Sequence, residues 1–200
     1  ATSCGSCHAG DGKGTLFTTL TRFGQTDQTG NKFLHLGGPQ LQNRAIPGYT
    51  PESIPAGATF SRFTPPSNTG LGFIELVSDE DILAMADPSD MDKDGITGEP
   101  SYGNLPSFIN ALPNAIPKNG KYIHRFGKKA ATYNLLHQTV NAYSQDIGIS
   151  SAFAPKDVYS GLEIDPEISN LTINNVVFYL QTLKAPIQRD QSDAQVQQGK

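Results

Sequence analysis

The sequence has no tryptophan, only two cysteines and two methionines, and no long apolar run. Its longest uninterrupted apolar stretch, Val176 to Leu180, has five residues, whereas a membrane-spanning helix needs about 20. Positive charge is also scarce, because 15 Lys and Arg stand against 19 Asp and Glu and the formal net charge is −4. A membrane-spanning helix within these residues is excluded. Nucleic acid is not an expected partner, since the chain lacks the basic character that phosphate backbones require.

The length and composition predict a folded chain with many loops. With 200 residues and 36% hydrophobic residues, the chain can bury a core without a disulfide framework. Its 20 glycines and 14 prolines stay below the share found in low-complexity chains. They nevertheless indicate long connections between regular elements.

Both cysteines lie in the segment Cys4-Gly5-Ser6-Cys7-His8, the C-x-x-C-H pattern typical of covalent c-type haem attachment. Two thiols on a tight turn can each form a thioether with one haem vinyl group, and the adjacent His8 is then placed to ligate the iron. Three other interpretations stay open: a thioredoxin-like redox pair, a structural disulfide, and a zinc site that recruits distant histidines. The glycine-rich continuation, in place of a βαβ pattern, favours haem.

Haem attachment predicts where the protein works. The thioether ligation of c-type cytochromes takes place outside the bacterial cytoplasm, so we expect a periplasmic or other extracytoplasmic protein. The sequence opens without the basic segment and apolar core of a signal peptide. A helix normally leads into the haem motif of a cytochrome c fold, whereas three residues precede Cys4, and we therefore expect an upstream segment.

Three helices are predicted after a loop-rich region over residues 9–75. The first covers 79–86, where Ser78 and Asp81 form a capping box and Pro88 follows the end. The second covers 130–145 and the third 171–183, both from apolar residues at three- to four-residue spacing. The third resembles the C-terminal helix of cytochrome c domains.

Few strand signals accompany these helices. The predicted fold class is therefore mainly α: a cytochrome c-like haem domain with long irregular loop insertions, over residues 1–185. Residues 186–200 read as a linker, yet 196–200 also resemble the helix that precedes haem motifs in multi-haem cytochromes. We expect this segment to be a linker or the first helix of a second haem domain.

Several blocks of the sequence together resemble one family. They are Gly38-Pro39-Gln40-Leu41-Gln42, Ala45-Ile46-Pro47-Gly48, Gly70-Leu71-Gly72-Phe73, Asp79-Glu80-Asp81-Ile82-Leu83-Ala84, Asp90-Met91-Asp92-Lys93-Asp94-Gly95-Ile96, Arg125-Phe126-Gly127-Lys128-Lys129-Ala130 and Asp146-Ile147-Gly148-Ile149. In this order they look like the di-haem putative peroxidase, or thiol-oxidoreductase-like, family of the bacterial di-haem cytochrome c peroxidase and methylamine-utilisation superfamily. The resemblance implies a periplasmic redox protein with two haem c domains, of which this chain is the first. Only one C-x-x-C-H is present, so the second haem is expected beyond Lys200.

The resemblance also implies two residues beside an open iron position. In the superfamily a helix carries a distal Gln followed by an acidic residue, and the matching positions are Gln138 and Asp146. A carboxylate can move the proton from the near to the far oxygen of a peroxide, and an amide can orient the molecule. The spacing of eight is shorter than in the peroxidases, Asp replaces Glu, and Ile147 stands where methionine is common. A solvated polar pair without chemistry is the alternative.

The sixth iron ligand distinguishes an enzyme from an electron carrier. A carrier fills this position with His or Met, whereas a peroxidase leaves it open. His35 is the histidine best placed by its apolar neighbours to reach a buried haem. The other candidates are Met85, Met91, His124 and His137. The alternative for these side chains is a place in the core or on the surface without a role as ligand.

Charge is unevenly distributed along the chain. Residues 79–99 hold eight of the 19 acids, and residues 100–145 hold five bases and no acid. Within the acidic part, Asp90, Asp92 and Asp94 before Gly95 resemble the first half of a Ca²⁺ loop, although Glu99 comes too early for a standard EF-hand. A capped acidic turn is the alternative. The basic part has three interpretations: a contact with the haem propionates, a docking surface, or a solvated loop. For a propionate contact Arg125 is the favoured residue, because its planar fork suits a carboxylate.

The sequence thus predicts one covalent haem c, held by Cys4, Cys7 and His8, with a Ca²⁺ site as an additional hypothesis. The predicted function is electron transfer with reduction of a small oxidant such as peroxide, and the partners are a second haem domain or a redox protein. A non-enzymatic electron carrier with a six-coordinate haem is the main alternative. A haem sensor is a third.

Overall fold

The computed structural model describes residues 3–15, 19–24, 26–27, 30–31, 40–43, 47–48, 50–156, 162 and 165–199. Its α-helices are α1 (Leu71–Leu76), α2 (Asp79–Ala84), α3 (Leu135–Asn141), α4 (Asn170–Thr182) and α5 (Ala194–Gln198). Two 3-10 turns, η1 (Cys4–Ser6) and η2 (Ala9–Asp11), open the chain, and a π-helical segment, η5 (Ala142–Ile147), continues α3. The described strands form three antiparallel pairs: β1 (Leu20–Phe23) with β4 (Phe60–Phe63), β2 (Thr26–Asp27) with β3 (Gly30–Asn31), and β5 (Tyr102–Gly103) with β6 (Tyr122–Ile123).

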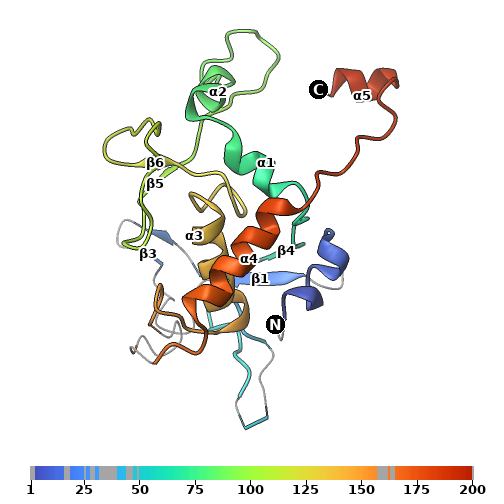
Figure 1. Cartoon of the computed structure of the whole chain (residues 1–200). Helices are drawn as coiled ribbons and strands as arrows, with labels where there is room; N and C mark the ends of the chain where they lie inside the picture. The colour runs from blue at the N-terminus through green and yellow to red at the C-terminus, as the bar shows by residue number, and fades with distance from the viewer. Residues whose placement is uncertain are drawn as a thin grey trace.

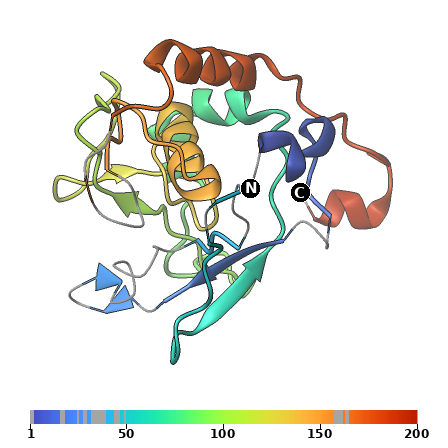
Figure 2. The ribbon, with the colours of Figure 1, turned by 90° about the horizontal axis from the view of Figure 1, so that it is seen from below.

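Helices α3 and α4 pack against each other at the centre of the molecule, and α1 contacts both (Figure 1). Figure 2 shows α4 along one edge, the β1–β4 pair along the opposite edge, and α5 apart from the central helices. The core is formed by apolar side chains of β1, α3, α4 and the segment between α2 and α3: Phe23, Ile109, Ile123, Phe126, Tyr133, Leu135, Val140 and Ile173.

Helix α1 fixes the positions of α3 and α4. A Cβ atom on Gly72 would lie 2.3 Å from the carbonyl oxygen of Gln181, so α1 approaches α4 with no space for a side chain. The Glu75 carboxylate accepts hydrogen bonds from the backbone N–H of Leu135 at 2.8 Å and from the Gln181 amide at 2.6 Å. One side chain of α1 therefore joins the start of α3 to α4.

The helices predicted over 79–86 and 171–183 are confirmed to within two residues at either end. Ser78 accepts a hydrogen bond from the backbone N–H of Asp81 at 3.0 Å, as the capping box requires, and Ser169 caps α4 in the same way through Thr172. The short helix expected over 196–200 begins at Ala194, because Asp193 caps it through the N–H groups of Gln195 and Val196.

The helix predicted over 130–145 is wrong at its start. Lys129 and Ala130 have φ angles of 59° and 46°, which are outside the right-handed helical region, and Thr132 pairs with Phe126 in a β-bridge. The side chain of Asn134 accepts a hydrogen bond from the N–H of His137 at 2.9 Å and starts α3 at Leu135. Buried residues before and inside the helix happened to share a helical spacing.

Long connections separate the helices, and three short strand pairs share the described part of the chain with them. The mainly α, cytochrome c-like class therefore stays a prediction. None of the described helices combines the length and hydrophobicity that crossing a bilayer requires.

Candidate functional site

A cavity of about 320 Å³ lies between the N-terminal turns, β1, α3 with η5, and α4. Its wall is mostly apolar, with Leu20, Phe63, Leu71 and Val176 among the lining residues. The same wall contains four of the residues singled out from the sequence: Cys4, His8, Gln138 and Asp146. A concave, largely apolar cavity with a few convergent polar groups is the usual form of a cofactor or ligand site.

The haem motif folds as a tight turn at one side of this cavity. The backbone N–H groups of Cys7 and His8 both donate to the carbonyl oxygen of Cys4, at 3.1 and 2.9 Å. Both cysteines carry free thiols. Partial burial raises the pKa of the Cys4 thiol, and the negative charges of Asp146 and Cys7 act in the same direction. A thioredoxin-type nucleophile needs a lowered pKa, so this environment disfavours the redox-pair interpretation.

Zinc coordination by the cysteines also gains no support. Among the residues that the structure describes, the group of three close metal-ligating side chains is Asp87, Asp90 and Asp92. Neither cysteine belongs to such a group. In the described part of the chain, the thiols therefore do not belong to a group of three or more close ligands, as a zinc site would require.

The imidazole of His8 is held by one of its two nitrogens. Its Nδ1 lies 2.8 Å from the carbonyl oxygen of Pro66, an acceptor that requires Nδ1 to carry the proton. The lone pair is then on Nε2, the nitrogen that remains to bind a metal, and an Nδ1–H donated to a carbonyl is the usual arrangement of metal-ligating histidines.

The loop that carries His8 is tied to the rest of the protein at several points. Gly14 donates its backbone N–H to Pro65, and Asn68 donates to the carbonyl oxygen of Asp11, at 3.0 and 2.9 Å. The hydroxyl of Tyr179 on α4 donates to the Asp11 carboxylate. Contacts with the segment before α1 and with α4 therefore fix the position of the haem motif.

Gln138 and Asp146 reach the cavity from one continuous helical segment. Eight residues of regular α-helix would separate their directions by roughly 80°. Gln138 lies on α3 and Asp146 on the π-helical η5, where the wider turn rotates the chain less per residue. The change of helix type brings both side chains onto the wall of the same cavity.

Asp146 is a partly buried carboxyl group on the cavity wall. Its burial raises the pKa of the carboxyl, and this effect is partly offset by the positive charge of Arg22 and by a hydrogen bond from Gln40. A raised carboxyl pKa brings the group closer to the range in which it acts both as base and as acid at neutral pH.

The cavity wall fits a haem in two respects. It is largely apolar, and it contains the cations Arg22 and Lys128, which suit carboxylates.

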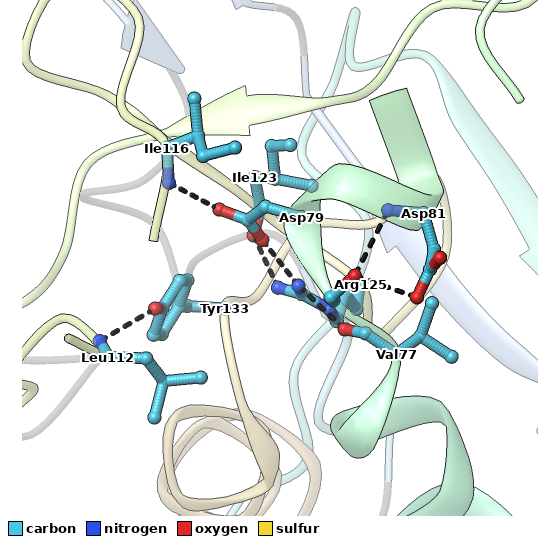
Figure 3. A network of polar contacts seen from close by, with 9 residues as sticks. Val77, Asp79, Asp81, Leu112, Ile116, Ile123, Arg125 and Tyr133 are labelled. Carbon is cyan, nitrogen blue, oxygen red and sulfur yellow. Dashed lines mark hydrogen bonds and ion pairs between the residues drawn. The ribbon is translucent and has the colours of Figure 1, made fainter. Parts of the chain in front are cut away.

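Arg125 is not among the residues that line the cavity. Its guanidinium forms an ion pair with the Asp79 carboxylate and donates to the carbonyl oxygens of Val77 and Ile123, at 3.0 and 3.1 Å (Figure 3). Asp79 in turn accepts from the backbone N–H of Ile116 at 2.7 Å. The side chain predicted to hold a propionate is committed to joining α2 to β6, whereas Arg22 and Lys128 are cations on the cavity wall.

The candidates for a sixth ligand do not gather at this cavity. Met85 and Met91 are 72% and 82% exposed. His124 and His137 are buried together, with ring centroids 5.8 Å apart, and neither they nor the methionines line the cavity. His35 lies outside the described residues.

The acidic loop differs from the predicted set of ligands by one residue. Carboxylate oxygens of Asp87, Asp90 and Asp92 lie within 4.8 Å of one another. Asp94 is not in the group, and its carboxylate accepts from the N–H of Ile96 at 2.7 Å. Asp87, which precedes the alternating pattern, was missed because the chain turns back between it and Asp90.

A family model described as "Di-haem oxidoreductase, putative peroxidase" matches residues 61–200. This region contains Gln138 and Asp146, whereas the C-x-x-C-H motif lies before it. No curated protein and no solved structure matches the chain.

Proposed function

The chain belongs to the di-haem oxidoreductase family, and on this premise we propose that it binds one haem c and reduces peroxide, or a similarly small oxidant, at that haem. The family supports a general redox role with haem as the cofactor. The observation that carries the finer proposal is the single cavity that gathers Cys4, His8, Gln138 and Asp146.

Cys4, Cys7 and His8 hold the haem in this proposal. Each thiol adds its sulfur and its hydrogen across one vinyl double bond, which forms a thioether without a leaving group. The Nε2 atom of His8 ligates the iron, because its Nδ1 is engaged with Pro66. Arg22 and Lys128 bind the propionates by charge, in the role that the sequence suggested for Arg125.

Gln138 and Asp146 act on the oxidant. A bound haem would supply the redox-active iron that reduction of the oxidant requires. The carboxylate of Asp146 accepts the proton of the near peroxide oxygen and returns it to the far oxygen, which leaves as water. Gln138 orients the peroxide through its amide. Complete reduction of one peroxide to two waters consumes two electrons and two protons, and the electrons come from a second haem domain or a redox partner protein.

The same proposal covers location and calcium. Thioether attachment of haem implies an extracytoplasmic protein. Asp90 and Asp92, joined by Asp87 in place of Asp94, are the carboxylates available for a Ca²⁺ ion, with an acidic turn stabilised by its own hydrogen bonds as the alternative.

An electronic spectrum of the haem-loaded chain tests the function. A high-spin ferric haem that reacts with hydrogen peroxide supports the proposal. A low-spin, six-coordinate haem that does not react with peroxide overturns it and supports an electron carrier, the runner-up. Of the sixth-ligand candidates that the structure describes, Met85, Met91, His124 and His137 do not line the cavity, so a carrier would need another residue in this position.

A further inference from the structure

A second, smaller cavity of about 140 Å³ adjoins the haem cavity. The two cavities share Gln138, Asp146, Arg22 and Lys128 in their walls, together with Gly127 and Ala142. The remaining wall of the smaller cavity is mostly polar and contains Thr132, Asn141 and Gln145. Since one water molecule occupies about 30 Å³ of liquid, this side cavity has room for a small hydrogen-bonding molecule.

Thr132 fixes the orientation of the Gln138 amide at the boundary of the two cavities. Its hydroxyl donates a hydrogen bond of 2.9 Å to Oε1 of Gln138. With the carbonyl end of the amide engaged, the NH₂ end is the part of Gln138 that remains to donate to a bound molecule. Thr132 itself is only 2% exposed, so water does not replace this contact.

The backbone around Thr132 is held firmly. Its N–H donates to the carbonyl oxygen of Phe126 at 3.0 Å, and its own carbonyl oxygen accepts from the N–H groups of Arg125 and Phe126, at 2.9 and 3.0 Å. The buried Arg125–Asp79 ion pair anchors this segment to α2. Thr132 is therefore a rigid support for the amide.

Gly127 leaves the space that the amide needs. Its φ angle is +76°, and a Cβ atom at this position would lie 3.0 Å from Oε1 of Gln138. A side chain here is disfavoured both by the backbone conformation and by the contact with the amide oxygen. Two residues outside α3 thus determine where the Gln138 amide lies.

We propose that Thr132 is a positioning residue that directs the N–H groups of Gln138 toward a small oxidant bound in the polar side cavity. The inference rests on the proposed function, because it assigns the oxidant of the same haem to this chamber. An oxidant whose oxygen atoms accept hydrogen bonds, such as hydrogen peroxide, satisfies the amide donors. The polar wall of this cavity favours hydrogen peroxide over an organic peroxide with an apolar substituent.

The test compares Thr132→Val, Thr132→Ser and an exposed matched control, Thr97→Val, in the haem-loaded full chain. Peroxide reduction is measured with a reduced dye as electron donor, and fluoride binding to the ferric haem is followed by its spectrum. Fluoride is a small anion that accepts hydrogen bonds from distal donors. Thr132→Val is expected to lower kcat/KM for hydrogen peroxide and the affinity for fluoride about 5- to 10-fold, the effect of one lost hydrogen bond. Thr132→Ser and Thr97→Val are expected to stay within about twofold of the parent chain.

The outcomes separate the two proposals. If the parent chain reduces peroxide and Thr132→Val matches it in both measurements, the inference is wrong and the proposed function stands. If the parent chain does not react with peroxide, the proposed function fails, and the fluoride comparison still decides the role of Thr132. A parent haem that neither reacts with peroxide nor binds fluoride overturns both. If Thr132→Val does not fold, Gly127→Ala is the second variant, because its methyl group displaces the same amide. It is expected to reduce the affinity for fluoride, and an unchanged affinity overturns the inference.

Discussion

Nδ1 of His8 lies 2.8 Å from the carbonyl oxygen of Pro66, a residue 58 positions later in the chain. This contact selects the tautomer of the imidazole and leaves Nε2 for a metal. It also connects the haem motif to the segment that leads into α1, which holds α3 and α4. The turn that carries His8 and the wall that carries Gln138 and Asp146 are therefore connected through the segment before α1.

Replacing both cysteines tests covalent haem attachment. We expect Cys4→Ala with Cys7→Ala to abolish covalent haem, because no other thiol exists in the sequence. Mass spectrometry of the denatured protein measures the attached haem, and each single variant should retain one thioether. A double variant that keeps covalent haem contradicts the assignment.

Replacing Asp146 tests proton transfer. Asp146→Asn should slow the reaction of the ferric haem with hydrogen peroxide by about 10²- to 10⁴-fold, the usual contribution of a general acid–base group. Stopped-flow spectroscopy gives this rate. Asp146→Glu keeps a carboxyl and should recover part of it. Equal rates in Asp146→Asn and the parent chain would falsify the role of this carboxylate.

Breaking the buried ion pair separates a structural role of Arg125 from a haem contact. Asp79→Ala leaves the guanidinium, whose side chain is 5% exposed, without its charged partner and should reduce the free energy of unfolding by about 3–5 kcal/mol. Urea unfolding measures the loss. The double variant Asp79→Leu with Arg125→Met should recover stability. If Arg125→Met instead shifts the haem reduction potential while stability is unchanged, Arg125 contacts the propionates after all.

The buried histidine pair predicts a loss of stability in acid. Burial, with a smaller contribution from the charge of His124, lowers the pKa of His137 to about 4, whereas in the unfolded chain it is about 6.5. Between these values the unfolded chain binds a proton that the folded chain does not, so stability is complete above pH of about 6.5 and falls as the pH approaches 4, by about 1–3 kcal/mol.

Urea unfolding at several pH values tests this dependence. His137→Gln should be less sensitive to pH across the same window, because one titrating group is gone. Since burial also lowers the pKa of His124, part of the dependence should persist. Identical curves for His137→Gln and the parent chain contradict the prediction.

Removing divalent cations tests the acidic loop. If Asp87, Asp90 and Asp92 bind Ca²⁺, chelation should lower the melting temperature, and added Ca²⁺ should restore it through preferential binding to the folded chain. Asp87→Asn should abolish this response, and Asp94→Asn should preserve most of it, since Asp94 lies outside the cluster. An unchanged melting temperature after chelation removes the hypothesis.

Local signals in the sequence predicted the local features well. Ser78 with Asp81 predicted the start of α2, because a cap acts over three residues. The boundary at Asn134 was missed because Tyr133, which precedes it, continues the three- to four-residue spacing of Leu136, Val140 and Tyr143. The spacing of apolar residues there reflects burial, whereas the start of α3 depends on the backbone conformation.

Candidate site residues were harder to assign where partners are distant in the chain. Arg125 had the right chemistry for a propionate, but Asp79, 46 residues earlier, occupies its guanidinium. Arg22 carries no motif, and only the fold places it beside Lys128 and Asp146 on the cavity wall.

The sequence by itself determined the haem motif, the cap of α2 and the family resemblance that singled out Gln138 and Asp146, because each is carried by residue types at short spacing. The tertiary structure decided which of these groups share a cavity. It turned Asp146 onto the face of Gln138 through a π-helical segment, joined His8 to Pro66, and withdrew Arg125 into an ion pair. These outcomes depend on packing between residues far apart in the chain, and on burial that changes the cost of charge, which no short pattern encodes.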